Sequence, residues 1–223
     1  HLVIPDTQVK PDYDQSHIDW IAKYAVAKKP DTIIVIGDWW DMESLSSYDV
    51  GQKSYEGRRY IKDIAAGKEA MERLLAPIRA ESARLLKGHR KHWNPRMVFC
   101  VGNHENRINR AIENDPKSDG LISLDDLGLE EMGFEVIPFL EPIVIDGIAY
   151  CHYFTSGVMG RPVSSARILL LRKMMSCVMG HVQDRDISYG RRGDGVNMIG
   201  LFCGICTTHD EAYLNPQTNG SWR

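Results

Sequence analysis

Short runs of apolar, mostly β-branched residues recur along the chain, and several of them end in a glycine or a polar side chain. The run at 33–36, for example, passes directly into Gly37 and Asp38. Uninterrupted apolar runs of this length are typical of strands buried on both faces of a parallel sheet. A glycine permits a sharp turn at the end of such a strand, where open α/β sheets place their ligands. We therefore expect Asp38 to lie in a crevice beyond the sheet edge.

The first half of the chain alternates strand-like and helix-like patterns. Apolar runs predict three strands, at 2–5, 32–36 and 97–101. Apolar residues at helical spacing predict a helix over 16–28 and a second one within the long excursion at 42–96, which Pro77 is expected to kink or divide. Strands and helices that alternate with short connections favour an α/β fold with a parallel sheet.

The second half of the chain favours hairpins. Strands are expected at 134–137, 143–145, 148–150 and 177–179, with a last hairpin at 186–206. Asp146-Gly147 and Gly193-Asp194-Gly195 supply tight turns. A helix is expected over 164–175 and short helical turns at 121–132. The sequence contains no repeat and no linker, so residues 1–223 are predicted to form a single domain.

Composition places the chain among ordinary globular proteins. It has 223 residues, of which 43% are hydrophobic and 26% charged, and no apolar run approaches the roughly 20 residues of a membrane span. The five cysteines, an odd number without framework spacing, predict buried free thiols in a reducing compartment. The pair Cys203 and Cys206 is expected to be structural rather than a redox or zinc site. We see no secretory signal, and the predicted location is the cytoplasm.

The charge pattern bears on nucleic-acid binding. A net charge of −3 gives no general attraction to nucleic acid or to an anionic membrane, so any such binding needs a local patch. The end of the excursion carries a cluster of basic and histidine side chains: Lys87, His89, Arg90, Lys91, His92 and Arg96. Two interpretations of this cluster stay open, a solvated helix end and a surface that binds phosphates.

Five polar clusters follow apolar runs in a fixed order. They are Asp6-x-Gln8, Gly37-Asp38-x-x-Asp41, Gly102-Asn103-His104-Glu105, an isolated His152, and Gly180-His181-x-Gln183. Each cluster alone is common, but the whole order resembles the calcineurin-like metallophosphoesterase superfamily, whose motifs are D-x-H, G-D-x-x-D, G-N-H-[DE], H and G-H-x-H. The resemblance covers residues 6–183. It implies a four-layer α/β/β/α sandwich, with two mixed sheets flanked by helices, and a phosphoesterase site with two divalent metals.

The resemblance also implies a ligand set for each metal ion. The first metal would be surrounded by Asp6, Gln8, Asp38 and Gln183. The second metal, to which Asp38 would bridge, would also be held by Asn103, His152 and His181. Two cations about 3.5–4 Å apart neutralise a phosphate group and supply a hydroxide nucleophile at neutral pH.

The chain departs from the family at Gln8 and Gln183, where histidine is usual. Both positions belong to the first metal, which would then have only oxygen donors. Oxygen ligands suit Mn²⁺ or Mg²⁺, whereas imidazole favours Zn²⁺ or iron. We therefore expect the cofactors to be two divalent ions, mainly Mn²⁺, with a weak first site.

Three residues of the motifs bind no metal under this assignment. The resemblance implies that His104 is the general acid that protonates the leaving alkoxide, and that Asp41 orients its ring. A neighbouring carboxylate raises the pKa of a histidine, as an acid near neutral pH requires. Glu105 is expected to brace its loop rather than to take part in the reaction.

Predicted contacts with the substrate come from three places: Arg107 and Arg110, the basic residues at 87–96, and Trp39. The basic side chains would contact backbone phosphates. Trp39 and Trp40 stand side by side in the second motif, and we expect one to pack in the core while the other stacks on a base at the mouth of the cleft.

Further departures from the family bear on the substrate. Met42 stands where the protein serine/threonine phosphatases carry arginine, which argues against that branch. The SbcD-type nucleases share the five motifs but add a capping domain, for which we expect too little chain after Gln183. What remains is similar to small stand-alone phosphoesterases that tailed bacteriophages encode, in which case the cytoplasm is that of the host cell.

The leading hypothesis is a phosphodiesterase or nuclease that acts on DNA or nucleotides through a metal-activated hydroxide. Two alternatives stay open, an unspecific phosphomonoesterase and a non-catalytic scaffold of the same fold.

Overall fold

Four parallel strands form the sheet that delivers the first polar clusters. The structure, a computed structural model, describes residues 1–47, 50–51 and 53–210. Its first sheet consists, in order, of β1 (Leu2–Ile4), β2 (Thr32–Val35), β3 (Arg96–Cys100) and β4 (Glu135–Ile137). All neighbours are parallel, so the predicted strands are confirmed, but the expectation of two mixed sheets is wrong for this one. A crossover connection leads from each strand to the next one along the chain, so that all four strands run in the same direction.

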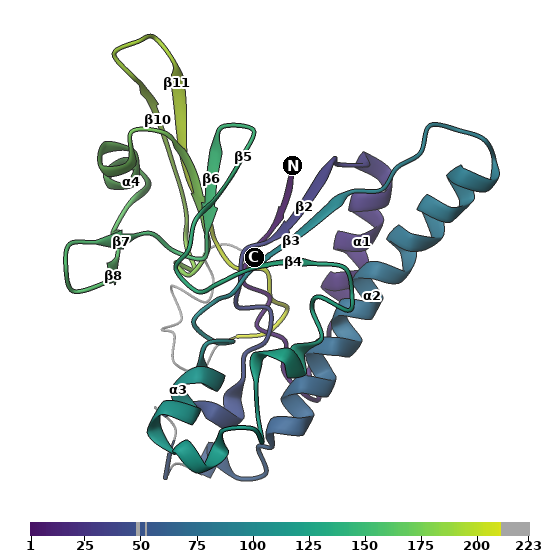
Figure 1. Cartoon of the computed structure of the whole chain (residues 1–223), viewed down its shortest axis with the longest axis vertical. Helices are drawn as coiled ribbons and strands as arrows, with labels where there is room; N and C mark the ends of the chain where they lie inside the picture. The colour runs from purple at the N-terminus through teal and green to yellow at the C-terminus, as the bar shows by residue number, and fades with distance from the viewer. Residues whose placement is uncertain (48–49, 52, 211–223) are drawn as a thin grey trace.

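Two helices cover one face of this sheet (Figure 1). α1 (Ser16–Lys28) has the predicted bounds, and α2 (Tyr60–Lys87) packs against it. Their apolar stripes are buried against the strands, with Ile18 of α1, Met71 of α2 and Phe99 of β3 all fully inaccessible. The helical periodicity of both segments therefore has a packing cause.

Pro77 lies inside α2 without dividing it. The helix continues for 28 residues, and the apolar residues on both sides of the proline, Leu74 and Ile78, are buried in the same core. Packing against the sheet thus outweighs the loss of a backbone hydrogen bond at proline, which costs about 3 kcal/mol.

The second sheet is mixed and has five strands. Its order is β10 (Arg185–Arg191), β11 (Asn197–Cys203), β9 (Ser176–Met179), β6 (Ile148–Cys151) and β5 (Ile143–Ile145). The two predicted hairpins are confirmed as β5–β6 and β10–β11. The short helix α4 (Ala166–Lys173) packs closely on β11, because Gly200 has no side chain: a Cβ there would lie 2.6 Å from the carbonyl oxygen of Ala166.

The helix α4 is shorter at both ends than the predicted range 164–175. Ser165 caps its start, because its hydroxyl oxygen accepts a hydrogen bond from the N–H of Ile168 at 3.3 Å. Met174 ends the helix in the left-handed conformation, with φ at 54°.

Three apolar clusters fill the molecule. One lies between the parallel sheet and the helices α1 and α2, and a second between the mixed sheet and α4. The third joins the two sheets, with Ile34 and Val98 from the first and Tyr150 and Val178 from the second. The described part of the chain is therefore a mixed α/β fold with several sheets and four α-helices.

The remaining elements are α3 (Arg107–Asn114), the two-stranded sheet of β7 (Thr155–Ser156) and β8 (Arg161–Pro162), and the short 3₁₀ helices Glu43–Leu45, Lys53–Tyr55, Pro116–Ser118 and Leu124–Leu127. The last of these confirms helical turns within 121–132. In the ranges that the structure describes, no helix is long and apolar enough to cross a membrane.

All five cysteines are free thiols. Cys100, Cys151 and Cys177 are buried, as predicted, whereas Cys203 and Cys206 are half-buried. Cys206 lies beyond the end of β11 rather than within one continuous strand, and its backbone N–H donates to the carbonyl of Asp6 at 2.8 Å.

Candidate metal centre

The loops after β1, β2 and β3 converge at one edge of the parallel sheet. Gly37 and Asp38, with φ of 100° and 52°, turn the chain sharply after β2. The backbone N–H of Gln8 donates to the carbonyl of Asp38 at 2.9 Å, which joins the first loop to the second. Gly102 of the third loop comes so close that a Cβ there would lie 2.2 Å from Oδ1 of Asp38. The predicted position of Asp38 beyond the strand end is confirmed.

Glu105 holds these loops together from the inside. Its Oε2 accepts hydrogen bonds from the backbone N–H groups of Asp38 at 3.0 Å and of Gly102 at 2.8 Å. Its Oε1 accepts a third from the N–H of Trp40 at 3.0 Å. The side chain is fully buried, so these bonds satisfy backbone groups that the sharp turns leave without a ladder partner. The prediction that Glu105 braces its loop is confirmed.

The second sheet contributes two histidines to the same point, because His152 lies just past β6 and His181 just past β9. Nδ1 of His152 bonds to the carbonyl of Ile36 at 2.9 Å, which leaves Nε2 3.3 Å from Oδ2 of Asp38. Oδ1 of Asn103 lies 2.9 Å from Nε2 of His152 and 2.6 Å from Nδ1 of His181. One ligand atom from each of Asp38, His152 and His181 lies within 4.8 Å of the others.

Asp6 adds a second buried carboxylate beside Asp38. Both of its oxygens accept from the N–H of His181, at 3.1 and 3.0 Å. Burial, together with the charge of Asp38, raises the pKa of Asp6 to about 7. Burial alone would lower the pKa of His152, but Asp38 and Asp6 outweigh it and raise this pKa to about 9. A positive charge at this point would therefore stabilise the ionised forms of the two adjacent buried carboxylates.

The donor set fits a divalent cation. Nε2 of His152 lies 2.9 Å from Oδ1 of Asn103 and 3.3 Å from Oδ2 of Asp38, and the raised pKa of the ring favours its positively charged form. Burial, with the charge of His152, lowers the pKa of His181 to about 4, so its ring is neutral at pH 7. A cation bound here would displace the His152 proton, because imidazole ligates metals in its neutral form. The residues predicted to hold the second metal are thus brought together.

The residues predicted to hold the first metal are Asp6, Gln8, Asp38 and Gln183. Asp6 and Asp38 are close enough for the charge of one to raise the pKa of the other. Gln8 is buried, with its backbone bonded to Asp38. Gln183 is half-buried and lies two residues beyond His181 in the chain.

His104 stands beside this cluster and is held by Asp41. Its Nδ1 lies 2.8 Å from Oδ1 of Asp41, and its Nε2 lies 3.7 Å from Oδ2 of Asp38. Burial lowers the pKa of His104, but the charge of Asp38 and the hydrogen bond to Asp41 outweigh it, so this pKa is raised. The predicted geometry, in which Asp41 orients the ring, is present.

Lys10 is a buried cation that the motifs did not single out. Its Nζ lies 3.1 Å from Oδ2 of Asp41 and 3.2 Å from Oε1 of Glu43, and only 5% of the residue is exposed. Lys10 thereby balances the charge of the carboxylate that orients His104. The one signal in the sequence is its place in the first motif loop, four residues after Asp6.

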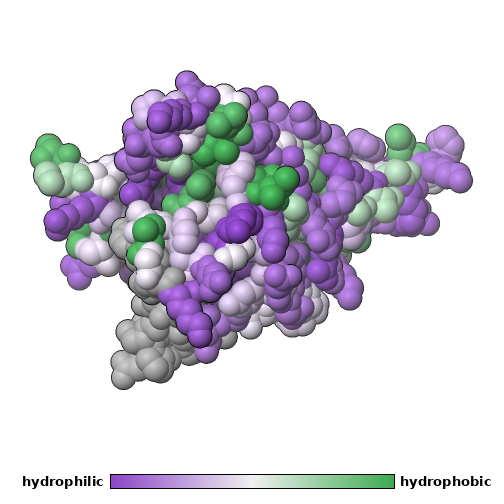
Figure 2. All heavy atoms as spheres, turned by 90° about the horizontal axis from the view of Figure 1, so that it is seen from below, coloured by the Kyte–Doolittle hydropathy of each residue, from purple (hydrophilic) through white to green (hydrophobic). Residues whose placement is uncertain are grey.

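Arg107 and Arg110 lie on α3, close behind His104 in the chain. Nη1 of Arg107 donates to the carbonyls of Asp41 at 2.7 Å and of Met42 at 3.2 Å, and its Nη2 lies 3.2 Å from Nε2 of His104. Arg107 therefore supports the loop that orients the histidine. Arg110 is exposed. Figure 2 views the end of the molecule that carries α3 and shows a mainly hydrophilic surface with separate hydrophobic spots. Contact of either arginine with a phosphate stays a prediction.

Trp39 cannot stack on a substrate. Trp39 and Trp40 are both fully buried, and the indole N–H of Trp39 donates to the carbonyl of Gly67 at 3.0 Å. The stacking prediction for Trp39 is therefore wrong. Its cause is α2, which covers both indoles: a Cβ at Gly67 would lie 1.7 Å from Nε1 of Trp40. The excursion at 42–96 thus anchors the second motif loop.

The basic residues at 87–96 lie at the opposite edge of the parallel sheet. They connect α2 to the start of β3, whereas Asn103 and His104 follow the end of that strand (Figure 1). The five residues of β3 separate the two edges by about 16 Å. This cluster therefore lies away from the metal centre, and its contact with backbone phosphates of a longer substrate stays a prediction.

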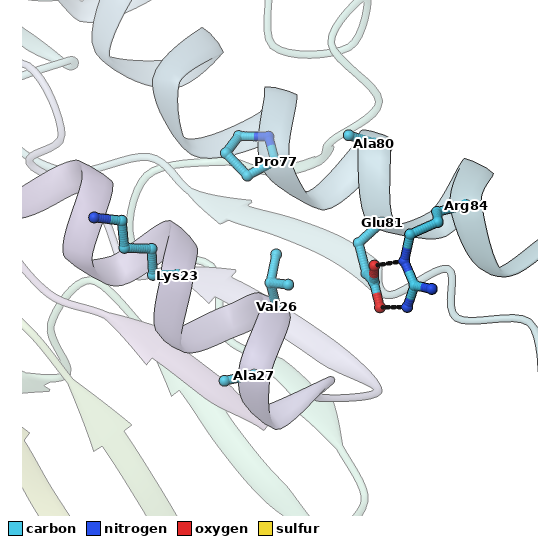
Figure 3. A pocket seen from close by; sticks show the side chains of 7 residues that line it. All are labelled: Lys23, Val26, Ala27, Pro77, Ala80, Glu81 and Arg84. Carbon is cyan, nitrogen blue, oxygen red and sulfur yellow. Dashed lines mark hydrogen bonds and ion pairs between the residues drawn. The ribbon is translucent and has the colours of Figure 1, made fainter.

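A groove between α1 and α2 also lies away from the cluster. It has a volume of about 450 Å³ and is lined by Lys23, Val26, Ala27, Pro77, Ala80, Glu81 and Arg84 (Figure 3). Its one carboxylate, Glu81, is paired with Arg84 at 2.6 Å and with Lys29 at 2.8 Å. The lining offers no donor set for a metal and no histidine, so we assign no chemistry to it.

Comparisons with known proteins assign the chain to no family. No protein-family model matches the chain, and no curated protein matches it. Function is therefore inferred from the side chains that the fold brings together.

Proposed function

We propose that the protein is a divalent-metal-dependent phosphodiesterase that acts on DNA or nucleotides. The observation that carries this proposal is the convergence of four donor side chains, beside which His104 stands: Asp38, Asn103, His152 and His181. Hydrolysis of a phosphate ester needs charge neutralisation on the phosphate and a proton for the leaving oxygen. The cluster can supply the first and His104 the second.

The proposal includes the four-layer α/β/β/α arrangement of the metallophosphoesterases. Three apolar clusters support it, because each fills the space between two layers: helices α1 and α2 on the first sheet, the first sheet on the second, and the second sheet on α4. The fully parallel first sheet is a departure from the pair of mixed sheets that the resemblance implies.

Two divalent cations are the proposed cofactors, with Mn²⁺ preferred and Mg²⁺ as a substitute. Asp38, Asn103, His152 and His181 would hold one ion, and Asp6, Gln8, Asp38 and Gln183 the other. When bound, such ions neutralise the phosphate and lower the pKa of a coordinated water. The set of Asp6, Gln8, Asp38 and Gln183 contains no imidazole, so it favours Mn²⁺ over Zn²⁺ and would bind its ion the more weakly.

His104 is proposed as the general acid. Asp41 fixes its Nδ1 at 2.8 Å, and the raised pKa of the ring favours the protonated form. The protonated ring gives its Nε2 proton to the leaving oxygen. The neutral ring then keeps its proton on Nδ1, facing Asp41, and its free Nε2 accepts from Arg107, whose Nη2 lies 3.2 Å away.

A substrate panel tests this proposal. The protein is assayed with nitrophenyl phosphate, bis-nitrophenyl phosphate, and labelled single- and double-stranded DNA, each with Mn²⁺, Mg²⁺ or Zn²⁺. We expect Mn²⁺-dependent cleavage of the diesters, little cleavage of the monoester, and no activity in Asp38→Asn, which keeps the size of the side chain but loses its charge. Preferential cleavage of the monoester would favour an unspecific phosphomonoesterase instead.

A non-catalytic scaffold is the second candidate, and the replacement of histidine at Gln8 and Gln183 favours it. Against it, the remaining motif side chains are present and converge on one point. Absence of hydrolysis with every metal, together with a stable partner in a pull-down, would decide for the scaffold. Five free cysteines support a reducing compartment, such as the cytoplasm of a cell or of a phage-infected host.

A further inference from the structure

The β10–β11 hairpin has one covered face and one open face. Residues directly opposite in an antiparallel pair share a face, and the register pairs Ile187 with Leu201 and Tyr189 with Ile199. Leu201 packs into the apolar cluster between the sheets. Further along the hairpin, Tyr189 is 73% exposed, Ile199 42% and Ile187 38%. The outer half of this face is therefore left without a covering element in the described structure.

The open face carries positive charge on a chain whose net charge is −3. Arg185, Ile187, Tyr189 and Arg191 occupy every second position of β10, so all four side chains lie on this face, and both arginines are exposed. Asp186 points to the other face, where its Oδ2 accepts from the N–H of Ala166 at 2.7 Å. An exposed aromatic ring flanked by two arginines complements a chain of phosphates and bases.

The face begins at the rim of the candidate metal centre. Arg185, the first residue of β10, follows Gln183 by two residues and His181 by four. From Arg185 to Tyr189 the strand advances by about 13 Å, away from the cluster. Figure 1 shows the hairpin projecting from the body of the molecule along this direction. A polynucleotide bound along β10 would therefore extend from the open face to the candidate metal centre.

We propose that the open face of the β10–β11 hairpin binds single-stranded nucleic acid, with Tyr189 stacked on a base and Arg185 and Arg191 on backbone phosphates. This inference rests on the proposed phosphodiesterase function and names its substrate as a polynucleotide with unpaired bases. Stacking requires an unpaired base, which selects single strands over duplex, and every base offers a ring face, so little sequence preference is expected.

Fluorescence anisotropy with labelled dT12, measured in EDTA so that no strand is cleaved, tests the inference. Removal of a stacking aromatic weakens binding at least about fivefold, so we expect this loss for Tyr189→Ala and near wild-type affinity for Tyr189→Phe. Arg191→Ala should reduce the slope of log K against log salt by about 0.7, the value for one phosphate contact on a single strand. The control is Tyr24→Ala, which removes a tyrosine on α1 that is 53% exposed and should bind as wild type does.

A thermal melt of each variant verifies that it is folded. Equal affinity of Tyr189→Ala and wild type would overturn the inference, as would a wild-type protein that does not bind dT12. A wild-type dimer that Tyr189→Ala dissociates in sedimentation experiments would also overturn it, because a second copy would then cover the face. Hydrolysis of bis-nitrophenyl phosphate by wild type separates the two proposals: cleavage without dT12 binding refutes only the nucleic-acid face, whereas dT12 binding without any cleavage refutes the phosphodiesterase.

Discussion

Nδ1 of His104 lies 2.8 Å from Oδ1 of Asp41, in a site where both side chains are buried. This contact fixes the ring and directs its other nitrogen toward Asp38, 3.7 Å away. A histidine held in this way presents Nε2 in a fixed direction, as the proposed transfer of a proton requires. This geometry supports the proposed roles, in which His104 is the general acid and His152 and His181 are metal ligands.

Replacement of His104 by alanine should lower turnover without loss of metal binding. General acids contribute about 10²- to 10⁴-fold to a rate, and we expect a loss in that range for bis-nitrophenyl phosphate with Mn²⁺. Calorimetric titration should show Mn²⁺ affinity close to wild type. His92→Ala, which removes an exposed histidine at the opposite sheet edge, serves as control. A His104→Ala protein that turns over within a few-fold of wild type would exclude the acid role.

Lys10 should stabilise the fold through Asp41 and Glu43. Its removal takes the ammonium group away from the buried carboxylate of Asp41 and the half-buried one of Glu43, and leaves Arg107 and Arg58 at 3.6 Å from them. Loss of one partner of a buried ion pair costs about 3–5 kcal/mol. We expect Lys10→Met to lower the free energy of unfolding in urea by about 3 kcal/mol, and Lys10→Arg to recover part of it. Lys29→Met, which breaks a surface pair with Glu81, should cost below about 1 kcal/mol. Similar values for both methionine variants would show that Lys10 has no special role.

Lys10 also shows where prediction from sequence ends. The motif residues are identifiable because each follows an apolar run that becomes a strand. The convergence of Asp6, Asp38 and Asn103 follows from the parallel topology of one sheet, whereas their meeting with His152 and His181 depends on the packing of the second sheet. Lys10 has no such pattern, since a lysine in a loop is usually solvated, and only the tertiary structure buries it against Asp41. Arg107 was identified, but its bonds to the carbonyls of Asp41 and Met42 were not.

The effect of Mn²⁺ on stability should grow with pH. The pKa of His152 is about 9 in the folded chain against 6.5 unfolded, so between pH 7 and 9 the folded metal-free protein binds more protons than the unfolded chain. The free energy of unfolding then falls as pH rises through this window. The shift of His181, whose pKa is lowered to about 4, acts below pH 6.5 and stays outside it.

Bound Mn²⁺ must displace the His152 proton, so its affinity should rise by up to about tenfold per pH unit. We therefore expect a fixed concentration of Mn²⁺ to raise the melting temperature more at pH 8.5 than at pH 7. Differential scanning fluorimetry with and without Mn²⁺ measures this. A shift that stays constant or shrinks over the same range would mean that His152 is not a ligand.

Gly67→Ala should destabilise the protein although alanine favours helices. In an exposed helix the change would stabilise by about 1 kcal/mol. Here the new Cβ would lie 1.7 Å from Nε1 of the buried Trp40, and overpacking of this kind costs about 1–3 kcal/mol or more. We expect a net loss of about 2 kcal/mol in urea unfolding. Gly193→Ala, where a Cβ would meet nothing within 4 Å, is the control. A stabilised Gly67→Ala protein would disprove the contact.

The two tryptophans show why the packing role of the excursion at 42–96 cannot be predicted from the sequence. Trp39 and Trp40 occupy a motif that borders the site, and the sequence therefore predicts that one of them is exposed. Their burial depends on α2 and on Gly67, which lie more than twenty residues further along the chain. The sequence predicts the helical periodicity of α2, but it does not predict the surface on which the helix packs. The same holds for the basic residues at 87–96, whose distance from the site depends on the direction in which α2 runs.

The most direct test of the metal centre is anomalous diffraction at the manganese edge from crystals grown with MnCl₂. We predict a strong peak within coordination distance of Asp38, Asn103, His152 and His181, and a weaker one beside Asp6 and Gln8. His152→Ala should remove the strong peak. Crystals that show no anomalous density at Asp38, or manganese only elsewhere on the protein, would contradict the account.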